Sequence, residues 1–191
     1  MLRLLVAYTT YDGHTAKIAE RIASTLRQAN CAVELCDIAR SRTDRPPEDY
    51  DGVIAGGPLH GGKHHPQLLK FASQNCDALN KQPSAFFSVS LSAAGNVEQQ
   101  GDATRCLNEF LDDAGWKPSA TAIVAGALLY RKYGFCTRWM MKMIVKRGGT
   151  GDTDTSRNHV YTDWDAVDEF AKEFTHQNVG RASERPTKAI T

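Results

Sequence analysis

Apolar runs alternate with amphipathic stretches along the 191 residues of the chain. Short, almost continuous apolar runs predict five buried strands, at 4–8, 31–38, 52–56, 84–91 and 120–129. Helical spacing of apolar residues predicts helices at 15–29, 98–114 and 164–176, and a further one that begins at Pro66. In the first helix the apolar stripe consists of Ile18, Ala19, Ile22, Ala23 and Leu26. Strands that alternate with helices in this way are typical of a parallel sheet covered on both faces.

Five such units predict one α/β domain over residues 1–178, with the flavodoxin-like, doubly wound strand order 2-1-3-4-5 and helices on both faces. Ligands of such sheets bind at the carboxyl ends of the strands. After the fifth strand the pattern breaks into a basic, Met-rich and Gly-rich insertion at 130–155. Residues 179–191 are expected to be a polar, disordered tail.

With 41% apolar and 24% charged residues, the composition is that of a soluble globular protein. The formal net charge of +1 favours no class of partner, and no nucleic-acid binding is expected. Five scattered cysteines without a C-x-x-C motif argue against a disulfide framework or a zinc site and favour a reducing compartment. No stretch approaches the roughly 20 apolar residues of a membrane span. A cytoplasmic location is therefore expected, with attachment to a membrane face left open.

The loop between the first predicted strand and helix has the composition of a phosphate site. It consists of Thr9, Thr10, Tyr11, Asp12, Gly13, His14 and Thr15. Backbone N–H groups, threonine hydroxyls and the positive end of a helix can together solvate a phosphate, and Gly13 lets the backbone turn closely. The alternative is a plain strand-to-helix turn, in which Asp12 only shapes the loop. The loop matches neither a Walker motif nor G-x-G-x-x-G, which counts against nucleoside triphosphates and dinucleotides.

Two further loops at the same edge of the predicted sheet are built from small or permissive residues. The loop after the third strand contains Gly57, Pro58, Leu59, His60 and Gly61. The end of the fourth strand and its loop contain Ser88, Val89, Ser90, Leu91, Ser92 and Ala93. Small residues allow the backbone to approach a flat ring closely. Together with the phosphate loop they predict a bound flavin mononucleotide, FMN.

Several stretches resemble one family of flavoproteins. They are Thr-Tyr-Asp-Gly-His-Thr at 10–15, Pro-Ser-Ala-Phe-Phe-Ser-Val-Ser-Leu at 83–91, Ala-Gly-Ala-Leu-Leu-Tyr at 125–130, Thr-Asp-Thr at 153–155 and Val-Tyr-Thr-Asp-Trp at 160–164. The first is shared by flavodoxins in general. The others, with the insertion, make the chain similar to the flavodoxin-like, quinone-dependent protoporphyrinogen IX oxidases (dehydrogenases) of bacterial haem biosynthesis, from Leu4 to about His176.

This resemblance implies a flavoenzyme of porphyrin biosynthesis. It implies FMN as cofactor, oxidation of protoporphyrinogen IX to protoporphyrin IX, and electrons passed to a membrane quinone such as menaquinone or ubiquinone. The flavin carries the redox chemistry, and no side chain is assigned a catalytic role. Three residues of the insertion are expected to close over the cofactor: Thr153, Asp154 and Thr155. Two alternatives stay open, a flavodoxin-like NAD(P)H:quinone reductase and a non-enzymatic electron carrier of the flavodoxin type.

The insertion carries six Lys or Arg and no carboxylate between Arg131 and Arg147. At helical spacing, Trp and Met side chains fall on one face and basic side chains on another. Such a helix can lie on an anionic membrane surface, so the chain is expected to associate peripherally with the inner face of the cell membrane. The alternatives are a docked helix whose Trp and Met side chains are core, and a basic segment that binds the porphyrin propionates.

Three histidines lie close together at His60, His64 and His65. A metal site is one interpretation of this group. No carboxylate is interleaved and the segment is rich in glycine, so a solvated loop is the favoured interpretation, and no metal is predicted.

Overall fold

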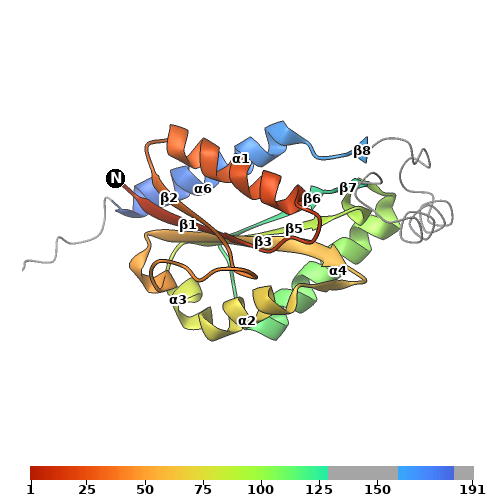
Figure 1. Cartoon of the computed structure of the whole chain (residues 1–191), viewed down its shortest axis with the longest axis horizontal. Coiled ribbons are helices and arrows are strands. Elements are labelled where there is room, and N and C mark those ends of the chain that lie inside the picture. The colour runs from red at the N-terminus through yellow and green to blue at the C-terminus, as the bar shows by residue number, and fades with distance from the viewer. Residues whose placement is uncertain (129–158, 183–191) are drawn as a thin grey trace, which may run out of the picture.

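The computed structural model describes residues 1–128 and 159–182 (Figure 1). Its central sheet has five parallel strands in the order β2-β1-β3-β5-β6. Their bounds are β1 (Arg3–Tyr8), β2 (Ala32–Asp37), β3 (Gly52–His60), β5 (Ser84–Ser90) and β6 (Ala120–Ala125). Counted along the chain among the parallel strands alone, this is the order 2-1-3-4-5, so the predicted flavodoxin-like topology is confirmed.

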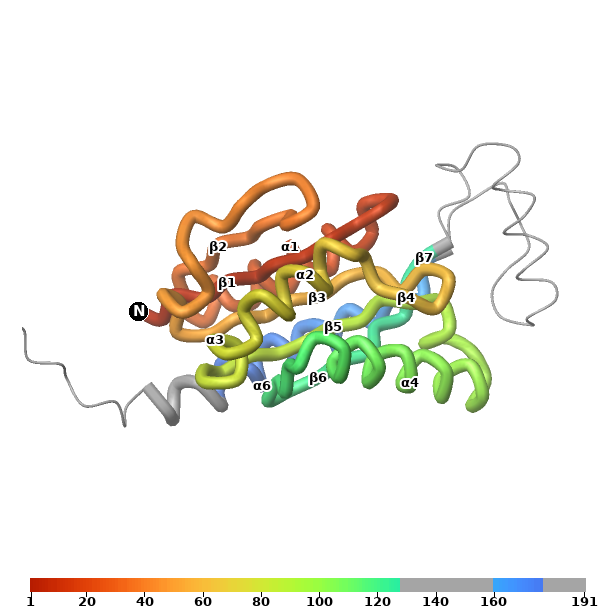
Figure 2. Tube along the Cα trace, turned by 90° about the horizontal axis from the view of Figure 1, so that it is seen from below, coloured from red at the N-terminus to blue at the C-terminus, as the bar shows by residue number. Residues whose placement is uncertain are grey.

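Helices cover both faces of the sheet, as predicted (Figures 1 and 2). One face packs against α1 (His14–Gln28) and α6 (Trp164–Ala182). The other packs against α2 (Pro66–Gln74), α3 (Cys76–Lys81) and α4 (Val97–Ala114). The predicted apolar stripe of α1 is fully buried in the first of these two cores. Two short 3-10 helices, η1 (Pro47–Asp49) and η2 (Ser92–Ala94), lie in the connections.

Helices α1 and α6 are joined by a polar contact as well as by packing. Both the Arg21 guanidinium and the Thr25 hydroxyl donate hydrogen bonds to the carboxylate of Asp168. These donors stabilise the ionised carboxylate, and they lower the pKa of Asp168 to about 2.

The third strand is longer than predicted, and this changes the shape of one predicted loop. Residues 57–60 continue β3 rather than leaving it, because Gly57 and Pro58 still pair with β5. The chain then turns back at Gly61 and Gly62, and β4 (Lys63–His64) pairs antiparallel with the end of β3. What was expected to be an open loop is therefore a β-hairpin, which we call the β3–β4 hairpin.

The fifth strand is shorter than predicted. It ends at Ala125, and the N–H of Gly126 binds the carbonyl oxygen of Ser90. The chain then enters β7 (Ala127–Leu128), which pairs antiparallel with β8 (His159–Val160). This two-stranded ribbon joins the sheet to both ends of the segment 129–158. The structure also adds α3, which was not predicted, and α6 includes residues 179–182 of the predicted tail.

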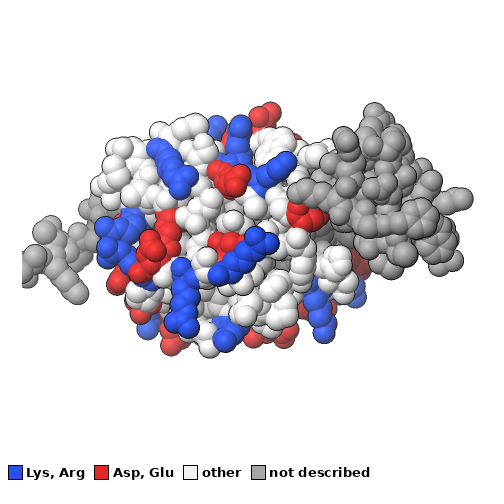
Figure 3. Space-filling view, viewed as in Figure 1, with Lys and Arg blue, Asp and Glu red and all other residues white. Residues whose placement is uncertain are grey.

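Among the described residues, no helix combines the length and apolar character needed to cross a membrane. On the face shown in Figure 3, basic and acidic side chains are interspersed over the described part of the surface. The basic segment Arg131–Arg147 lies outside the described residues.

Candidate functional site

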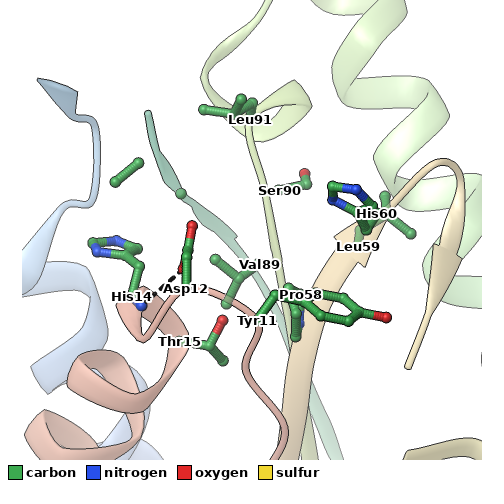
Figure 4. A pocket seen from close by; sticks show the side chains of 12 residues that line it. Tyr11, Asp12, His14, Thr15, Pro58, Leu59, His60, Val89, Ser90 and Leu91 are labelled. Carbon is green, nitrogen blue, oxygen red and sulfur yellow. Dashed lines mark hydrogen bonds between the residues drawn. The ribbon is translucent and has the colours of Figure 1, made fainter. Parts of the chain in front are cut away.

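A cavity of about 460 Å³ opens at the carboxyl ends of β1, β3, β5 and β6. This is the edge at which ligands of doubly wound sheets bind. Figure 4 shows how side chains from separate segments of the chain surround it. Its lining residues are Tyr11, Asp12, His14, Thr15, Pro58, Leu59, His60, Val89, Ser90, Leu91, Gly126 and Ala127. The volume lies within the range of pockets that hold small molecules and cofactors.

The amino-terminal end of α1 lies at this cavity, and its local structure suits an anion. Gly13 precedes the helix with a φ of 90°, in the left-handed region that glycine adopts readily. The first turn of α1 contains no acidic residue, and its N-cap residue, Gly13, has no side chain that could cap it. The N–H groups at a helix start have no intrahelical acceptor and carry a partial positive charge. The end of α1 can therefore bind a phosphate.

Two side chains hold the loop in shape. The N–H of Gly13 donates to Thr10 Oγ1 at 2.9 Å, and the N–H of His14 donates to Asp12 Oδ1 at 3.0 Å. Asp12 thus acts as a turn residue, the role that sequence reasoning favoured for it. Its carboxylate also lines the cavity, so it adds a negative charge where a phosphate would bind.

Thr9 is placed differently from the rest of the loop. Its side chain is fully buried and is absent from the cavity lining. Its Oγ1 is buried and has no hydrogen-bond partner among the described residues. The hydroxyl lies against Gly57, where an added Cβ would come within 2.5 Å of it. Position 57 is therefore occupied by glycine because the packing leaves no room for a Cβ atom.

A short chain of hydrogen bonds connects the loop to the residues that follow β8. His14 Nε2 lies 2.7 Å from Thr162 Oγ1, and this hydroxyl donates to the carbonyl oxygen of Ala125 at 2.6 Å. Since the hydroxyl has only one hydrogen, which Ala125 receives, His14 Nε2 must be the donor to Thr162. The start of α1 is in this way fixed to the end of β6.

Three aromatic rings meet beside the cavity. The ring of Tyr11 lies 5.4 Å from that of His60 and 5.3 Å from that of His65, measured between centroids. Tyr11 is 54% exposed, so one large aromatic surface faces solvent at the cavity. His65 is the N-cap of α2, and its Nδ1 accepts a hydrogen bond from Gln67 N–H at 3.1 Å.

His64 contradicts the expectation of a solvated histidine loop. Its side chain is buried, its Nε2 lies 2.9 Å from Ser88 Oγ, and its ring packs against those of Phe86 and Phe110. Burial lowers the pKa of His64 to about 4, so the ring is neutral at physiological pH. In the described part of the chain no group of His, Cys, Asp and Glu could hold a metal ion, and the three histidines make no such group there.

The structure thus brings together ten of the residues that the sequence predicted around a flavin. Other predicted residues lie in the same segments without lining the cavity: Thr9, Thr10, Gly13, Gly57, Gly61, Ser88, Ser92 and Ala93. Thr153, Asp154 and Thr155 lie outside the described residues. Sequence reasoning missed Gly126 and Ala127, although a glycine inside an apparent strand is a known signal for a break.

Comparison with known proteins identifies the family. The family described as "Flavodoxin domain" matches residues 5–156. The protein named protoporphyrinogen IX dehydrogenase (quinone) of Escherichia coli is 35% identical over 176 residues, which are 92% of this chain and 96% of that protein. The protein of the same name from Leishmania major is 33% identical over 174 residues, 90% of this chain and 74% of that protein. This chain belongs to the protoporphyrinogen IX dehydrogenase (quinone) family.

Solved structures support the fold of this dehydrogenase family member. Oxidised flavodoxin 1 from Bacillus cereus matches with a TM-score of 0.56 and 21% identity, over 91% of this chain and 97% of that one. At this identity the likeness concerns the fold alone. The flavodoxin domain itself implies a flavin-binding protein, as the sequence predicted.

Proposed function

We propose that this chain is an FMN-dependent protoporphyrinogen IX dehydrogenase that passes electrons to a membrane quinone. The observation that carries the proposal is the 35% identity to the Escherichia coli enzyme, which extends over 92% of this chain and 96% of that protein. An identity that extends along nearly the whole of both chains supports the same substrate and acceptor. A flavodoxin fold alone would not support them, because one fold serves many functions.

The described residues fit FMN. The phosphate would lie at the start of α1, where backbone N–H groups and the hydroxyl of Thr15 would be its donors. The ring would lie between apolar residues of β3 and apolar residues at the end of β5 and directly after it, which would keep water from it. These apolar residues are Pro58, Leu59, Val89 and Leu91. Gly126 and Ala127 close the site on the β6 side without bulky side chains.

Bound FMN supplies a two-electron acceptor for the substrate and a donor for the quinone. The chain's own groups bind and orient. The hydrogen bond with the Thr162 hydroxyl fixes the orientation of the His14 ring. The β3–β4 hairpin positions Pro58 and Leu59 at the cavity. The contacts of Thr153, Asp154 and Thr155 with the cofactor remain a prediction, because these residues lie outside the described part of the chain.

The test is an assay of the purified, yellow protein under anaerobic conditions with protoporphyrinogen IX. Porphyrin fluorescence that develops only when a quinone is added is the expected result. Flavin bleaching by NADH or NADPH, without porphyrin formation, would instead indicate the NAD(P)H:quinone reductase. Electron exchange with a protein partner, and no turnover of either small molecule, would indicate the electron carrier. A protein that neither contains nor takes up a flavin would contradict all three.

We also propose peripheral attachment to an anionic membrane through Arg131–Arg147, on the cytoplasmic side. The support is the sequence: six basic residues without a carboxylate, together with a quinone acceptor that resides in the membrane. Each basic residue near an anionic surface contributes about 1 kcal/mol. Replacing Arg138, Lys142 and Lys146 together by Glu should therefore reduce sedimentation with anionic vesicles by about a hundredfold or more in partition coefficient. Unchanged sedimentation with retained flavin would contradict the proposal.

A further inference from the structure

One cluster of side chains beside the cavity is not needed to hold a flavin phosphate. Tyr11 lies between the rings of His60 and His65, and Lys63 stands directly opposite His60 in the β3–β4 hairpin. Directly opposite residues of an antiparallel pair project to the same face of the ribbon, so Lys63 and His60 share a face. We call Tyr11, His60, Lys63 and His65 the hairpin cluster.

The hairpin cluster offers hydrogen-bond donors and a positive charge. His65 Nδ1 accepts from Gln67 N–H, so in the neutral ring the hydrogen is on Nε2, which is a donor. The Lys63 ammonium is exposed, and the structure shows no ion pair for it with any described carboxylate. Around the hairpin turn the surface is open, because a Cβ added at Gly61 or Gly62 would meet nothing within 4 Å.

The same cluster has an apolar surface that leads into the cavity. Tyr11 and His60 belong both to the cluster and to the cavity lining (Figure 4). The half-exposed ring of Tyr11 can pack against a flat or saucer-shaped apolar molecule. A molecule held at the hairpin by its acidic groups would therefore have its apolar body beside the flavin-binding cavity.

We infer that the hairpin cluster binds the carboxylates of the tetrapyrrole substrate and directs its macrocycle toward the cavity. The inference rests on the proposed function, which supplies a substrate with an apolar macrocycle and two propionates. Lys63 and the Nε2–H of His65 pair with the carboxylates, and Tyr11 contacts the macrocycle. A quinone has no carboxylate, so the cluster distinguishes the electron donor from the electron acceptor.

The experiment changes the charge on both the protein and the ligand. The protein variant is Lys63→Gln combined with His65→Asn, in which asparagine keeps a side-chain acceptor at the N-cap of α2. Lys70→Gln, an exposed lysine on α2 away from the cavity, is the matched control. The ligands are protoporphyrin IX and its dimethyl ester, with binding measured by fluorescence, and the corresponding porphyrinogens for KM.

We expect the double variant to weaken binding of the diacid, and to raise its KM, by about tenfold, which is the effect of losing partly exposed charged hydrogen bonds. Binding of the dimethyl ester, the KM for the quinone and the flavin content should stay as in the wild type. The Lys70→Gln variant should behave as the wild type throughout.

Equal loss of diacid and ester binding, or no loss of either, would overturn the inference. If the double variant does not fold, Lys63→Glu alone, at the exposed turn, gives the same comparison: it must weaken binding of the diacid and leave that of the ester. Because binding is measured without turnover, charge-dependent binding in a protein that oxidises no porphyrinogen would refute the proposed reaction and leave the cluster standing. Quinone-linked turnover with equal affinity for acid and ester would support the proposed reaction and refute the role of the hairpin cluster.

Discussion

His64 Nε2 and Ser88 Oγ are joined by a buried hydrogen bond of 2.9 Å, which links the β3–β4 hairpin to β5. Both partners are adjacent in sequence or in register to residues that line the cavity: His64 pairs with Leu59, and Ser88 precedes Val89. The bond therefore fixes the distance between two walls of the candidate flavin site. The ring contacts with Phe86 and Phe110 hold the imidazole in place from the α4 side.

The burial of His64 predicts a pH dependence of stability. The pKa of this ring falls from 6.5 in the unfolded chain to about 4 in the folded one. Between these values the unfolded state binds more protons, so the free energy of unfolding decreases as the pH falls from 6.5 toward 4. Between pH 7 and pH 5 the loss from this one residue is about 2 kcal/mol. Urea unfolding of the wild type and of His64→Leu at both pH values measures it.

The leucine variant should have a smaller decrease between the two pH values. At pH 7 it should be less stable than the wild type by about 1–3 kcal/mol, since the Ser88 hydroxyl is left buried without a partner. Adding Ser88→Ala removes that hydroxyl and should restore part of the loss. An equal pH dependence in the wild type and in His64→Leu would show that another group titrates in this range.

Much of the fold follows from local patterns, and the rest depends on tertiary contacts. The near-continuous apolar runs predicted all five parallel strands, because strands buried on both faces need apolar residues throughout. The two-residue strand β4 has no periodic signal of its own, and it forms because His64 fits against Phe110 and Ser88. For the same reason the expectation of a solvated histidine loop was wrong at His64, although residues 60–63 are exposed. The division of the last apolar run at Gly126 depends on pairing with β8, which is remote in sequence.

The candidate site divides in a similar way. The loop 9–15 was recognised because a glycine and hydroxyl residues before a helix have a direct chemical meaning. The direction of each side chain was not accessible from the sequence. Thr9 and Thr15 look equivalent there, yet only Thr15 lines the cavity.

Replacing Asp12 by Asn should strengthen FMN binding. Asparagine keeps the Oδ1 acceptor for the N–H of His14 and removes a negative charge beside the proposed phosphate position. Relief of about 1 kcal/mol of repulsion corresponds to about fivefold tighter binding. Fluorescence titration of the apoprotein with FMN measures the dissociation constant. Riboflavin, which has no phosphate, is the control ligand and should bind both proteins equally; a gain for riboflavin as well would contradict the electrostatic explanation.

Replacing Thr9 by Val should raise stability and leave FMN binding unchanged. The Thr9 hydroxyl is buried without a partner and points to Gly57 rather than to the cavity, so its removal relieves a desolvation cost of about 1 kcal/mol. Thermal unfolding of the apoprotein and titration with FMN measure the two effects. Weaker FMN binding by Thr9→Val would instead make Thr9 a phosphate donor, as the sequence suggested. Thr15→Val, in which a lining hydroxyl is lost, should weaken FMN binding in the same assay.

Two Gly→Ala substitutions should have opposite effects on stability. At Gly57 a Cβ would lie 2.5 Å from Thr9 Oγ1 and 2.7 Å from Leu68 Cδ2, so alanine there overpacks the core and should cost about 1–3 kcal/mol. At Gly101, inside α4, a Cβ meets nothing within 4 Å, so alanine should stabilise the helix by about 0.5–1 kcal/mol. Urea unfolding of both variants, with the flavin removed, gives the comparison directly. Because Gly57 lies in β3 next to Pro58 of the cavity wall, its alanine variant should also bind FMN more weakly, whereas the Gly101 variant should bind it as the wild type does. A Gly57→Ala protein as stable as the wild type would mean that β3 and α2 can move apart, and that the close packing of Thr9, Gly57 and Leu68 does not hold this wall in place.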